Sequence, residues 1–202
     1  DSISILDGSS SVSLDFDYRD FENKKIFRDI KSLGHVVENS DLIKQVHLKI
    51  KNNLKPEKAQ RIKSKVLDIN VNKFEAKVFL ENNKTITADL IVAADGKNSL
   101  IRNMIGIKES RSIYNQEAYV AQIFHEKEHN NIALEKFLPG GPLAVLPMRK
   151  IDKKCRSAII WSDEKKVSRS RLESSRKSPE VIAHELEQHC FEWLGKIKLY
   201  GS

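Results

Sequence analysis

The sequence predicts a mixed α/β fold, of the α+β type, in which helices and one parallel-type strand are joined to a mostly antiparallel layer of strands. Short runs of alternating apolar and polar residues, bounded by turn residues, indicate antiparallel strands. A continuous apolar run at residues 90–94 is typical of a strand buried on both faces of a parallel sheet. Because these patterns are segregated along the chain, we expect two subdomains.

The first third of the chain is predicted to contain a hairpin and a helix. Residues 2–17 alternate apolar and polar side chains on either side of Asp7-Gly8, which predicts two strands across a turn. A polar stretch extends to about residue 31. Asn39, Ser40 and Asp41 can then cap a helix over residues 42–52, whose apolar side chains (Leu42, Ile43, Val46 and Ile50) share one face.

The middle third is predicted to form strands and a short helix. Residues 65–71 alternate as a strand, and residues 75–80 and 84–88 flank Glu81-Asn82-Asn83 as a second hairpin. The apolar run at 90–94 ends at Asp95-Gly96. A helix over residues 99–105 is closed by Gly106, a residue type common just after a helix.

The last third is predicted to form antiparallel strands followed by a helix. The strand candidates are residues 119–124, 133–137, 143–147 and 157–161, with turns at Asn130-Asn131, at Pro139-Gly140-Gly141 and around Lys153. Residues 168–178 are rich in Ser, Arg and Lys and predict a mobile loop or a poorly packed helix. Ser178 and Pro179 then begin a helix that ends at Gly195 and presents Val181, Ile182, Leu186, Cys190 and Leu194.

Composition excludes several classes of protein. No run of about 18 apolar residues predicts a membrane-spanning helix, and no secretory signal opens the chain. Because the first residue is Asp1 rather than Met, we expect an internal piece of a longer protein.

The net charge of +7 comes from basic residues that are scattered among 28 acidic residues and form no basic stripe, which argues against a nucleic-acid binder. Cys155 and Cys190 fit no CxxC pattern and predict buried, reduced thiols.

Three local patterns leave open or exclude particular roles. The basic stretch at residues 49–65 fits either a solvated helix end or attraction to an anionic membrane surface, the second being attractive only for a lipid substrate. His125 and His129 have the spacing of a metal site only on a helix, whereas the flanking residues predict strands. The segment Pro139-Gly140-Gly141-Pro142 lacks the lysine of a phosphate loop and predicts a tight turn.

The segment from Asp89 to Arg102 carries the clearest chemical signal. A buried strand would deliver Asp95-Gly96 at its carboxyl end, where α/β sheets bind ligands. Gly96 permits close approach to the backbone, and Ser99 can cap the following helix. A plain strand-to-helix turn, with Asp and Gly present for turn chemistry, explains the segment equally well.

This segment resembles the Asp-Gly motif of the flavin-dependent aromatic hydroxylases, in which an apolar strand precedes Asp-Gly, Ser and Arg. Further blocks resemble the ubiquinone-biosynthesis branch of that family. They are residues 33–39 (Leu-Gly-His-Val-Val-Glu-Asn, with His35 where Tyr is expected), residues 114–147, and residues 157–162.

The resemblance implies an incomplete FAD-binding domain of the aromatic-hydroxylase type plus a mostly antiparallel substrate-domain sheet. It divides the chain into a substrate-domain hairpin at 1–32, a partial FAD-binding domain at 33–108, and a substrate-domain sheet with a C-terminal helix at 109–202. The implied activity is hydroxylation of a polyprenylated phenol in ubiquinone biosynthesis, with FAD, NAD(P)H and O₂. The implied location is cytoplasmic, with peripheral contact at the inner membrane face or with a ubiquinone-biosynthesis complex.

The resemblance also assigns residues to the two sides of the site. Asp95, Gly96, Ser99 and Arg102 would lie on the cofactor side, whereas the substrate side would include Phe137, Pro139, Gly141 and Pro147. No residue is assigned as a catalytic acid or base, and no metal is expected. None of the eight glycines forms GxGxxG and the second Gly-Asp motif is absent, so we expect the chain alone to bind FAD weakly or not at all. The alternative is a non-catalytic fragment acting as a scaffold or interaction piece.

Overall fold

The computed structural model describes residues 1–202 except 9, 11, 22–30, 54–58 and 201–202. The chain divides into two compact units, one formed by Asp1–Ile43 with Tyr114–Ser202 and the other by Lys44–Ile113. The polar stretch before residue 31 lies largely outside the described residues. The mixed α/β class is confirmed, whereas the assignment of residues 1–32, 33–108 and 109–202 to cofactor and substrate domains stays a prediction.

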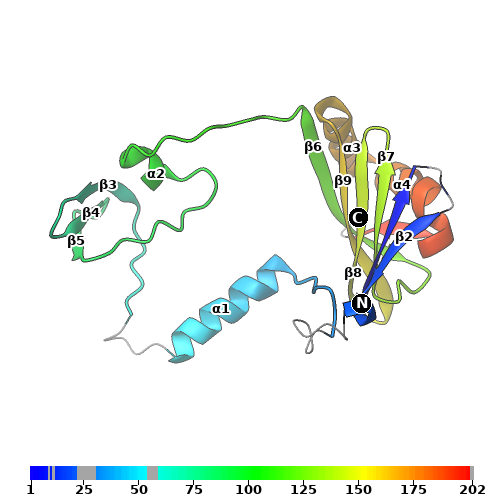
Figure 1. Ribbon diagram of the computed structural model, residues 1–202, viewed down its shortest axis with the longest axis horizontal. Coiled ribbons are helices and arrows are strands. Elements are labelled where there is room, and N and C mark those ends of the chain that lie inside the picture. The colour runs from blue at the N-terminus through cyan, green and yellow to red at the C-terminus, as the bar shows by residue number, and fades with distance from the viewer. Residues whose placement is uncertain (9, 11, 22–30, 54–58, 201–202) are drawn as a thin grey trace. The chain divides into compact units, whose positions relative to one another are not determined.

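The larger unit is built on a seven-stranded sheet in the order β10-β6-β9-β8-β7-β1-β2 (Figure 1). All neighbouring strands are antiparallel except β1 and β7, which run parallel. The predicted hairpin at residues 2–17 is therefore confirmed and adds two strands to a sheet made mostly from the far end of the chain. The strands are β1 (Ser2–Asp7), β2 (Ser13–Asp17), β6 (Gln116–His125), β7 (Ile132–Leu138), β8 (Gly141–Ile151), β9 (Lys154–Glu164) and β10 (Ile197–Leu199).

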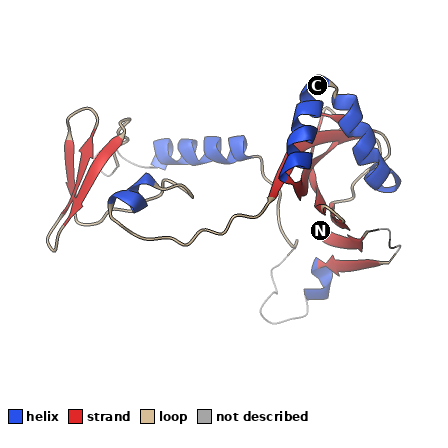
Figure 2. Cartoon of the chain, turned by 90° about the horizontal axis from the view of Figure 1, so that it is seen from above, coloured by secondary structure: helices blue, strands red, loops and turns tan. Residues whose placement is uncertain are grey.

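Two helices, α3 (Lys165–Lys177) and α4 (Pro179–Leu194), lie on one face of this sheet (Figure 2). Side chains alternate between the two faces of a strand, and the odd-numbered residues of β6, β8 and β9 face the helices. Trp161, Leu143 and Ile159 are fully buried there against Leu186 and Cys190 of α4. A short 3-10 helix, η1 (Tyr18–Phe21), follows β2.

The structure corrects two predictions about these helices. Of the two alternatives predicted for residues 168–178, the mobile loop is wrong, because most of them lie in helix α3. The helix is packed through Ser168 and Arg171, which are buried. The Arg171 guanidinium lies 3.6 Å from the centre of the Trp161 ring, and Asp163 and Glu185 accept its hydrogen bonds. Basic composition suggested exposure, yet ion pairs and stacking allow an arginine to be buried.

The start of α4 also differs in detail from the prediction. Pro179 occupies the first turn as expected, but the Ser178 side chain makes no capping hydrogen bond. Ile182, Leu186, Cys190 and Leu194 are buried as predicted, whereas Val181 faces solvent. Both cysteines are free and buried, so their predicted burial is confirmed.

The smaller unit contains a three-stranded antiparallel sheet and a short helix. The strands β3 (Val66–Val71), β4 (Ala76–Leu80) and β5 (Thr85–Ala88) follow one another in chain order, and α2 (Leu100–Met104) comes later. The predicted hairpin around Asn82 and Asn83 is confirmed, with Asn83 in the left-handed region at φ 62°. Ile69, Ala76 and Leu80 are its buried apolar residues.

The prediction of a buried parallel strand at residues 90–94 is wrong for this structure. No strand pairing is formed by that segment within the described residues, and Leu90 and Val92 are each 78% exposed. A strand buried on both faces needs a neighbour on each side and cover above and below. Apolar composition indicates that a segment is suited to burial, but it does not provide the partner strands.

The helix α1 (Asn39–Asn53) begins three residues before the predicted start, because the Leu42 amide already donates to the Glu38 carbonyl oxygen. Its predicted apolar face exists, yet Leu42, Ile43, Val46 and Ile50 are each about half exposed. Within the described part of the chain, none of the helices has the length and hydropathy needed to cross a bilayer.

Candidate functional site

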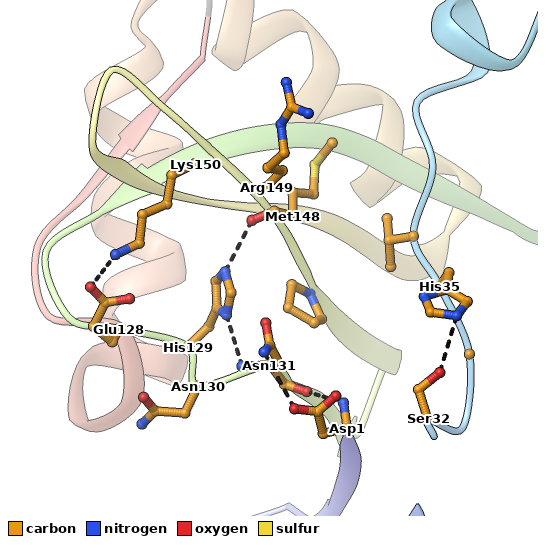
Figure 3. Close-up of a pocket in the computed structure, with 13 residues that line it drawn as sticks. Asp1, Ser32, His35, Glu128, His129, Asn130, Asn131, Met148, Arg149 and Lys150 are labelled. Atoms are coloured by element: carbon orange, nitrogen blue, oxygen red, sulfur yellow. Dashed lines mark hydrogen bonds and ion pairs between the residues drawn. The ribbon is translucent and has the colours of Figure 1, made fainter. Parts of the chain in front are cut away.

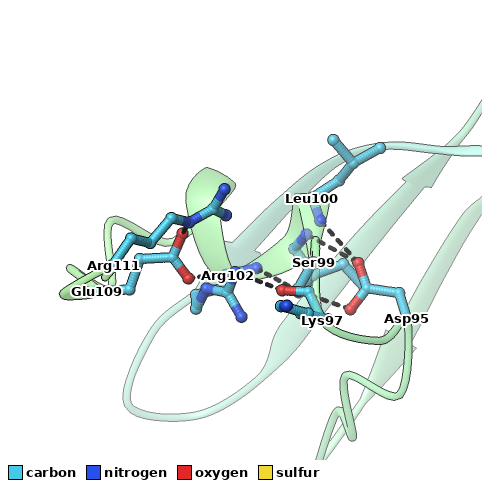
Figure 4. Close-up of polar contacts among 8 residues, drawn as sticks. Asp95, Lys97, Ser99, Leu100, Arg102, Glu109 and Arg111 are labelled. Carbon is cyan, nitrogen blue, oxygen red and sulfur yellow. Dashed lines mark hydrogen bonds and ion pairs between the residues drawn. The ribbon is translucent and has the colours of Figure 1, made fainter. Parts of the chain in front are cut away.

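Asp95 and Ser99 together cap the amino end of α2 (Figure 4). The Ser99 hydroxyl donates to Asp95 Oδ1 at 2.6 Å and accepts from the Arg102 amide at 2.9 Å. Asp95 Oδ2 accepts from the Leu100 and Ile101 amides at 2.8 and 3.2 Å. The hydrogen bond from Ser99 is the main reason that the pKa of Asp95 lies below its usual range. The carboxylate is therefore ionised at neutral pH and held rigidly in the turn.

Arg102 is held by two acceptors that contact the same guanidinium nitrogen. Nη2 donates to the Lys97 carbonyl oxygen at 2.9 Å and forms an ion pair with Glu109 at 2.5 Å (Figure 4). Its Nε is buried and has no hydrogen-bond partner among the described residues. A buried donor without an acceptor is unfavourable, and such groups often mark a ligand position.

This turn fits one part of a flavin cofactor. Gly96 has φ 86°, and nothing within 4 Å would meet a side chain placed there, so a ligand can approach its backbone closely. The unsatisfied Arg102 Nε offers a donor on the same turn. Asp95, Gly96, Ser99 and Arg102 are thus brought together as the sequence predicted, although their contact with a cofactor stays a prediction.

The face of the large sheet opposite α3 and α4 is apolar and partly open. Strand register places Phe137 beside Pro142, Ala144 beside Ile160, and Ile160 beside Val120 on this face. Phe137 is 48% and Val120 64% exposed, and Phe16 of β2 extends the face at its edge. We call this surface, formed by Ile3, Ile5, Leu14, Phe16, Val120, Ala133, Phe137, Pro142, Ala144, Leu146, Ala158 and Ile160, the open face.

The four predicted substrate-side residues are not gathered at one point. Phe137, Pro139 and Gly141 lie at the β7–β8 turn, where Leu138 pairs with Gly141. Pro147 lies six residues after Gly141 in β8. At ~3.4 Å per residue of a strand, the two residues are about 20 Å apart. Of the four, Phe137 has its side chain on the open face, and the substrate role of all four stays a prediction.

Pro147 instead lines a polar cavity of about 650 Å³ between the β6–β7 loop, β8 and residues 32–36 (Figure 3). His35 and His129 face this cavity, and Glu128 pairs with Lys150 at its rim. The His129 ring accepts from the Asn131 amide and donates to the Met148 carbonyl oxygen, each at 3.0 Å. Both of its ring nitrogens are therefore occupied by backbone groups.

His125 has a structural role at the end of β6. Its Nδ1 lies 2.8 Å from the Lys127 carbonyl oxygen and its Nε2 lies 2.9 Å from the Ser157 hydroxyl. Burial lowers the pKa of the imidazole, which favours the neutral form in these contacts. No group of three or more metal-ligating side chains is found among the residues that the structure describes.

Two charged residues on the face opposite the helices were not marked by any sequence motif. Arg156 of β9 is buried there, and it donates to Glu38 at 2.6 Å and to Gln122 at 3.2 Å. Glu135 of β7 lies between apolar side chains. Alternation along each strand could have placed both residues on one face, but only the strand register shows which residues are their neighbours.

The FAD binding domain family matches residues 58–193, which is about two thirds of the chain. The ubiquinone hydroxylase UbiL of Rhodospirillum rubrum is 34% identical over 122 residues, covering 60% of this chain and 27% of that protein. The mitochondrial ubiquinone biosynthesis monooxygenase COQ6 of Danio rerio is 35% identical over 102 residues, covering 50% of this chain and 20% of that protein. The chain thus matches about a quarter of the length of these relatives.

Klebsiella pneumoniae HpxO, solved with FAD and uric acid, has a similar fold. The TM-score is 0.57 at 14% sequence identity, and the match covers 80% of this chain and 39% of HpxO. Such a low identity supports the fold alone. Taken with the family match and the ubiquinone hydroxylase relatives, these findings show that the chain belongs to the FAD-binding family of class A flavin monooxygenases.

Proposed function

We propose that the protein forms part of an FAD-dependent monooxygenase that hydroxylates a polyprenylated phenol in ubiquinone biosynthesis, using NAD(P)H and O₂. The observation that carries the proposal is the similarity to ubiquinone hydroxylases, together with a family match over residues 58–193, a range that includes the Asp95 turn and strands β6 to β9. When bound, the flavin supplies the redox and oxygen chemistry. The protein's own part is to hold the cofactor, orient the ring and exclude water.

The Asp95 turn would hold the cofactor. The ionised Asp95 carboxylate fixes the geometry of the turn through Ser99 and the first amides of α2. Gly96 leaves its backbone accessible, and the unpaired Arg102 Nε can donate to an oxygen or nitrogen of the cofactor. A hydrogen bond from a charged group contributes about 1.5–3 kcal/mol, so Arg102 should matter measurably.

The open face would bind the phenol and the first units of its apolar tail. Phe137, Pro142 and Ile160 offer apolar area, and burying it contributes about 25 cal/mol per Å². Covering this face also keeps water from the reacting ring. A substrate with a long prenyl tail favours peripheral contact of the protein with a membrane or with other proteins of the pathway. In a bacterial cell, this contact would lie on the cytoplasmic side of the inner membrane.

Flavin titration of the protein expressed from its complete reading frame tests the cofactor side. Arg102→Met should weaken FAD binding about tenfold, because it removes the buried donor. Arg111→Met is the matched control, since Arg111 also pairs with Glu109 and its loss removes the same charge. Equal FAD affinity in both variants and the wild type would show that Arg102 does not contact the cofactor.

A further inference from the structure

Glu135 is an ionisable residue placed among apolar side chains on the open face. In β7, the side chains of Leu134 and Lys136 lie on the face that packs against the helices. Leu134 belongs to the core, and Lys136 donates a hydrogen bond to the His189 carbonyl oxygen in α4. Because side chains alternate along a strand, Glu135 points away from the helices. The register sets it between Ile5 of β1 and Ala144 of β8.

The immediate surroundings leave the carboxylate without compensation. Ala133 and Phe137 flank it along β7, and Ile160 lies one strand beyond Ala144. No hydrogen bond or ion pair to Glu135 occurs within the part of the chain that the structure describes, and its side chain is only partly exposed. Burial raises the pKa of Glu135.

A ligand lying on the open face would remove more water from this carboxylate. That desolvation is costly unless the ligand supplies a hydrogen-bond donor where water is lost. Ala133 and Ala144 have short side chains, so a flat ring can lie over them while Phe137 and Ile160 border it. A ring that carries one hydroxyl satisfies both requirements. Its flat apolar surface can pack on the two alanines, and its hydroxyl can donate a hydrogen bond to the carboxylate.

We propose that Glu135 accepts a hydrogen bond from the phenolic hydroxyl of the substrate and so fixes which way the ring lies on the open face. The proposal rests on the function proposed above, because it takes the ligand to be a phenol. Glu135 is thereby a specificity-determining residue, because it makes a hydroxylated ring bind more tightly than an apolar ring of the same shape. No proton transfer is required, since the hydrogen bond is enough to orient the ring.

The test compares two ligands of matched shape, ortho-butylphenol and butylbenzene, by NMR titration of the full 202-residue chain. We expect the wild type to bind the phenol about tenfold more tightly, as a hydrogen bond to a charged acceptor allows. In Glu135→Leu this preference should disappear, whereas butylbenzene should bind as well as before or better. Glu135→Gln keeps an amide oxygen as acceptor and should retain part of the preference.

Glu173→Leu is the matched control, because Glu173 is an exposed acid of α3, a helix that packs on the other face. It should leave the preference for the phenol unchanged. Acidification gives a second readout. The wild-type preference should fall as the pH drops through the raised pKa of Glu135, whereas Glu135→Gln should show no such dependence.

The outcomes separate the two proposals. If both ligands perturb the open face with equal affinity, Glu135 does not select the hydroxyl, while the open face survives as a binding surface. If neither ligand perturbs it, both the role of Glu135 and the proposed substrate surface are wrong. A protonated butylamine that binds more tightly than the phenol would overturn the proposal in favour of a cationic ligand.

Discussion

Arg171 shows how one side chain can organise the packing of a helix. Its guanidinium is nearly buried, stacks on Trp161 and pairs with Asp163 at 2.8 Å and with Glu185 at 3.0 Å. A planar guanidinium can stack on a ring and still donate along its edge, which a lysine cannot do. The arginine therefore joins α3, α4 and β9, although composition had suggested a loose segment.

Removing this contact should destabilise the protein. Arg171→Ala leaves Asp163 and Glu185 without their partner and uncovers Trp161, so we expect a loss of about 2–3 kcal/mol in the free energy of unfolding. Arg169→Ala is the control, because Arg169 pairs with Glu117 at the surface and should cost less than about 1 kcal/mol. Urea denaturation measures both, and equal losses would contradict the structural role of Arg171.

The cap that Asp95 forms at the start of α2 should depend on pH. The pKa of Asp95 is lowered chiefly by the Ser99 hydrogen bond, so the cap is fully formed above the usual value of 3.8. The stabilisation of α2 is then lost as the pH falls through the lower pKa of the folded chain. Ser99→Ala should raise the pKa of Asp95 toward its usual value, and Ser99→Thr should not.

Carboxyl NMR titration of Asp95 in the three proteins measures this effect. Chemical shifts of the Leu100 and Ile101 amides should follow the same titration, because Asp95 Oδ2 accepts from both. An unchanged pKa in Ser99→Ala would mean that Ser99 does not hold the carboxylate.

At the scale of elements, the turns were the most predictable part of the fold. Asp7-Gly8, Asn130-Asn131 and Pro139-Gly140 each have residues suited to turns, and each connects strands in the structure. The strands themselves extend beyond the predicted ends, since β8 and β9 continue to Ile151 and from Lys154 around a tight turn. The charged residues near that turn do not show the apolar alternation typical of strands, so the sequence did not indicate that β8 and β9 pair there.

Gly141 shows that a candidate site residue can also be required by the turn. It has φ 148°, and a side chain there would come within 2.6 Å of the Ser162 carbonyl oxygen on the neighbouring strand. Gly141→Ala should therefore cost about 1–3 kcal/mol in the free energy of unfolding. Gly106→Ala, where φ is 72° but the space is open, should cost about 1 kcal/mol.

Thermal unfolding of the two glycine variants, followed by circular dichroism, distinguishes these effects. A Gly141→Ala protein as stable as Gly106→Ala would show that the β7–β8 turn relaxes freely. Its glycine would then have to be explained by a ligand contact rather than by the fold.

At the scale of the molecule, the sequence predicted the two kinds of architecture but not how they are connected. Alternation along β6 to β9 identified an antiparallel layer, and Leu186 and Cys190 marked the buried face of α4. The parallel pairing of β1 with β7 joins residues about 130 positions apart and has no local signal. For the same reason, no pattern could show that Ile5 and Ala144 border Glu135.

The Asp95 turn and the open face were predictable from the sequence to different degrees. Asp95, Gly96, Ser99 and Arg102 are close in sequence, so a motif could bring them together on one turn. The open face draws on six strands, and its members are separated by long stretches of chain. Pro147 was grouped with Phe137 because both lie in the segment that resembles the family, yet about half of β8 separates them.

In the proposed function, the protein takes part in hydroxylating a phenol with oxygen from O₂. The most direct measurement is mass spectrometry of the product formed under ¹⁸O₂ by the protein expressed from its complete reading frame. FAD, NADPH and an ortho-prenylated phenol would be supplied. We expect a product that contains one ¹⁸O atom on the ring and that forms only when FAD and NADPH are both present. An unmodified phenol, although FAD is bound and NADPH is consumed, would contradict it.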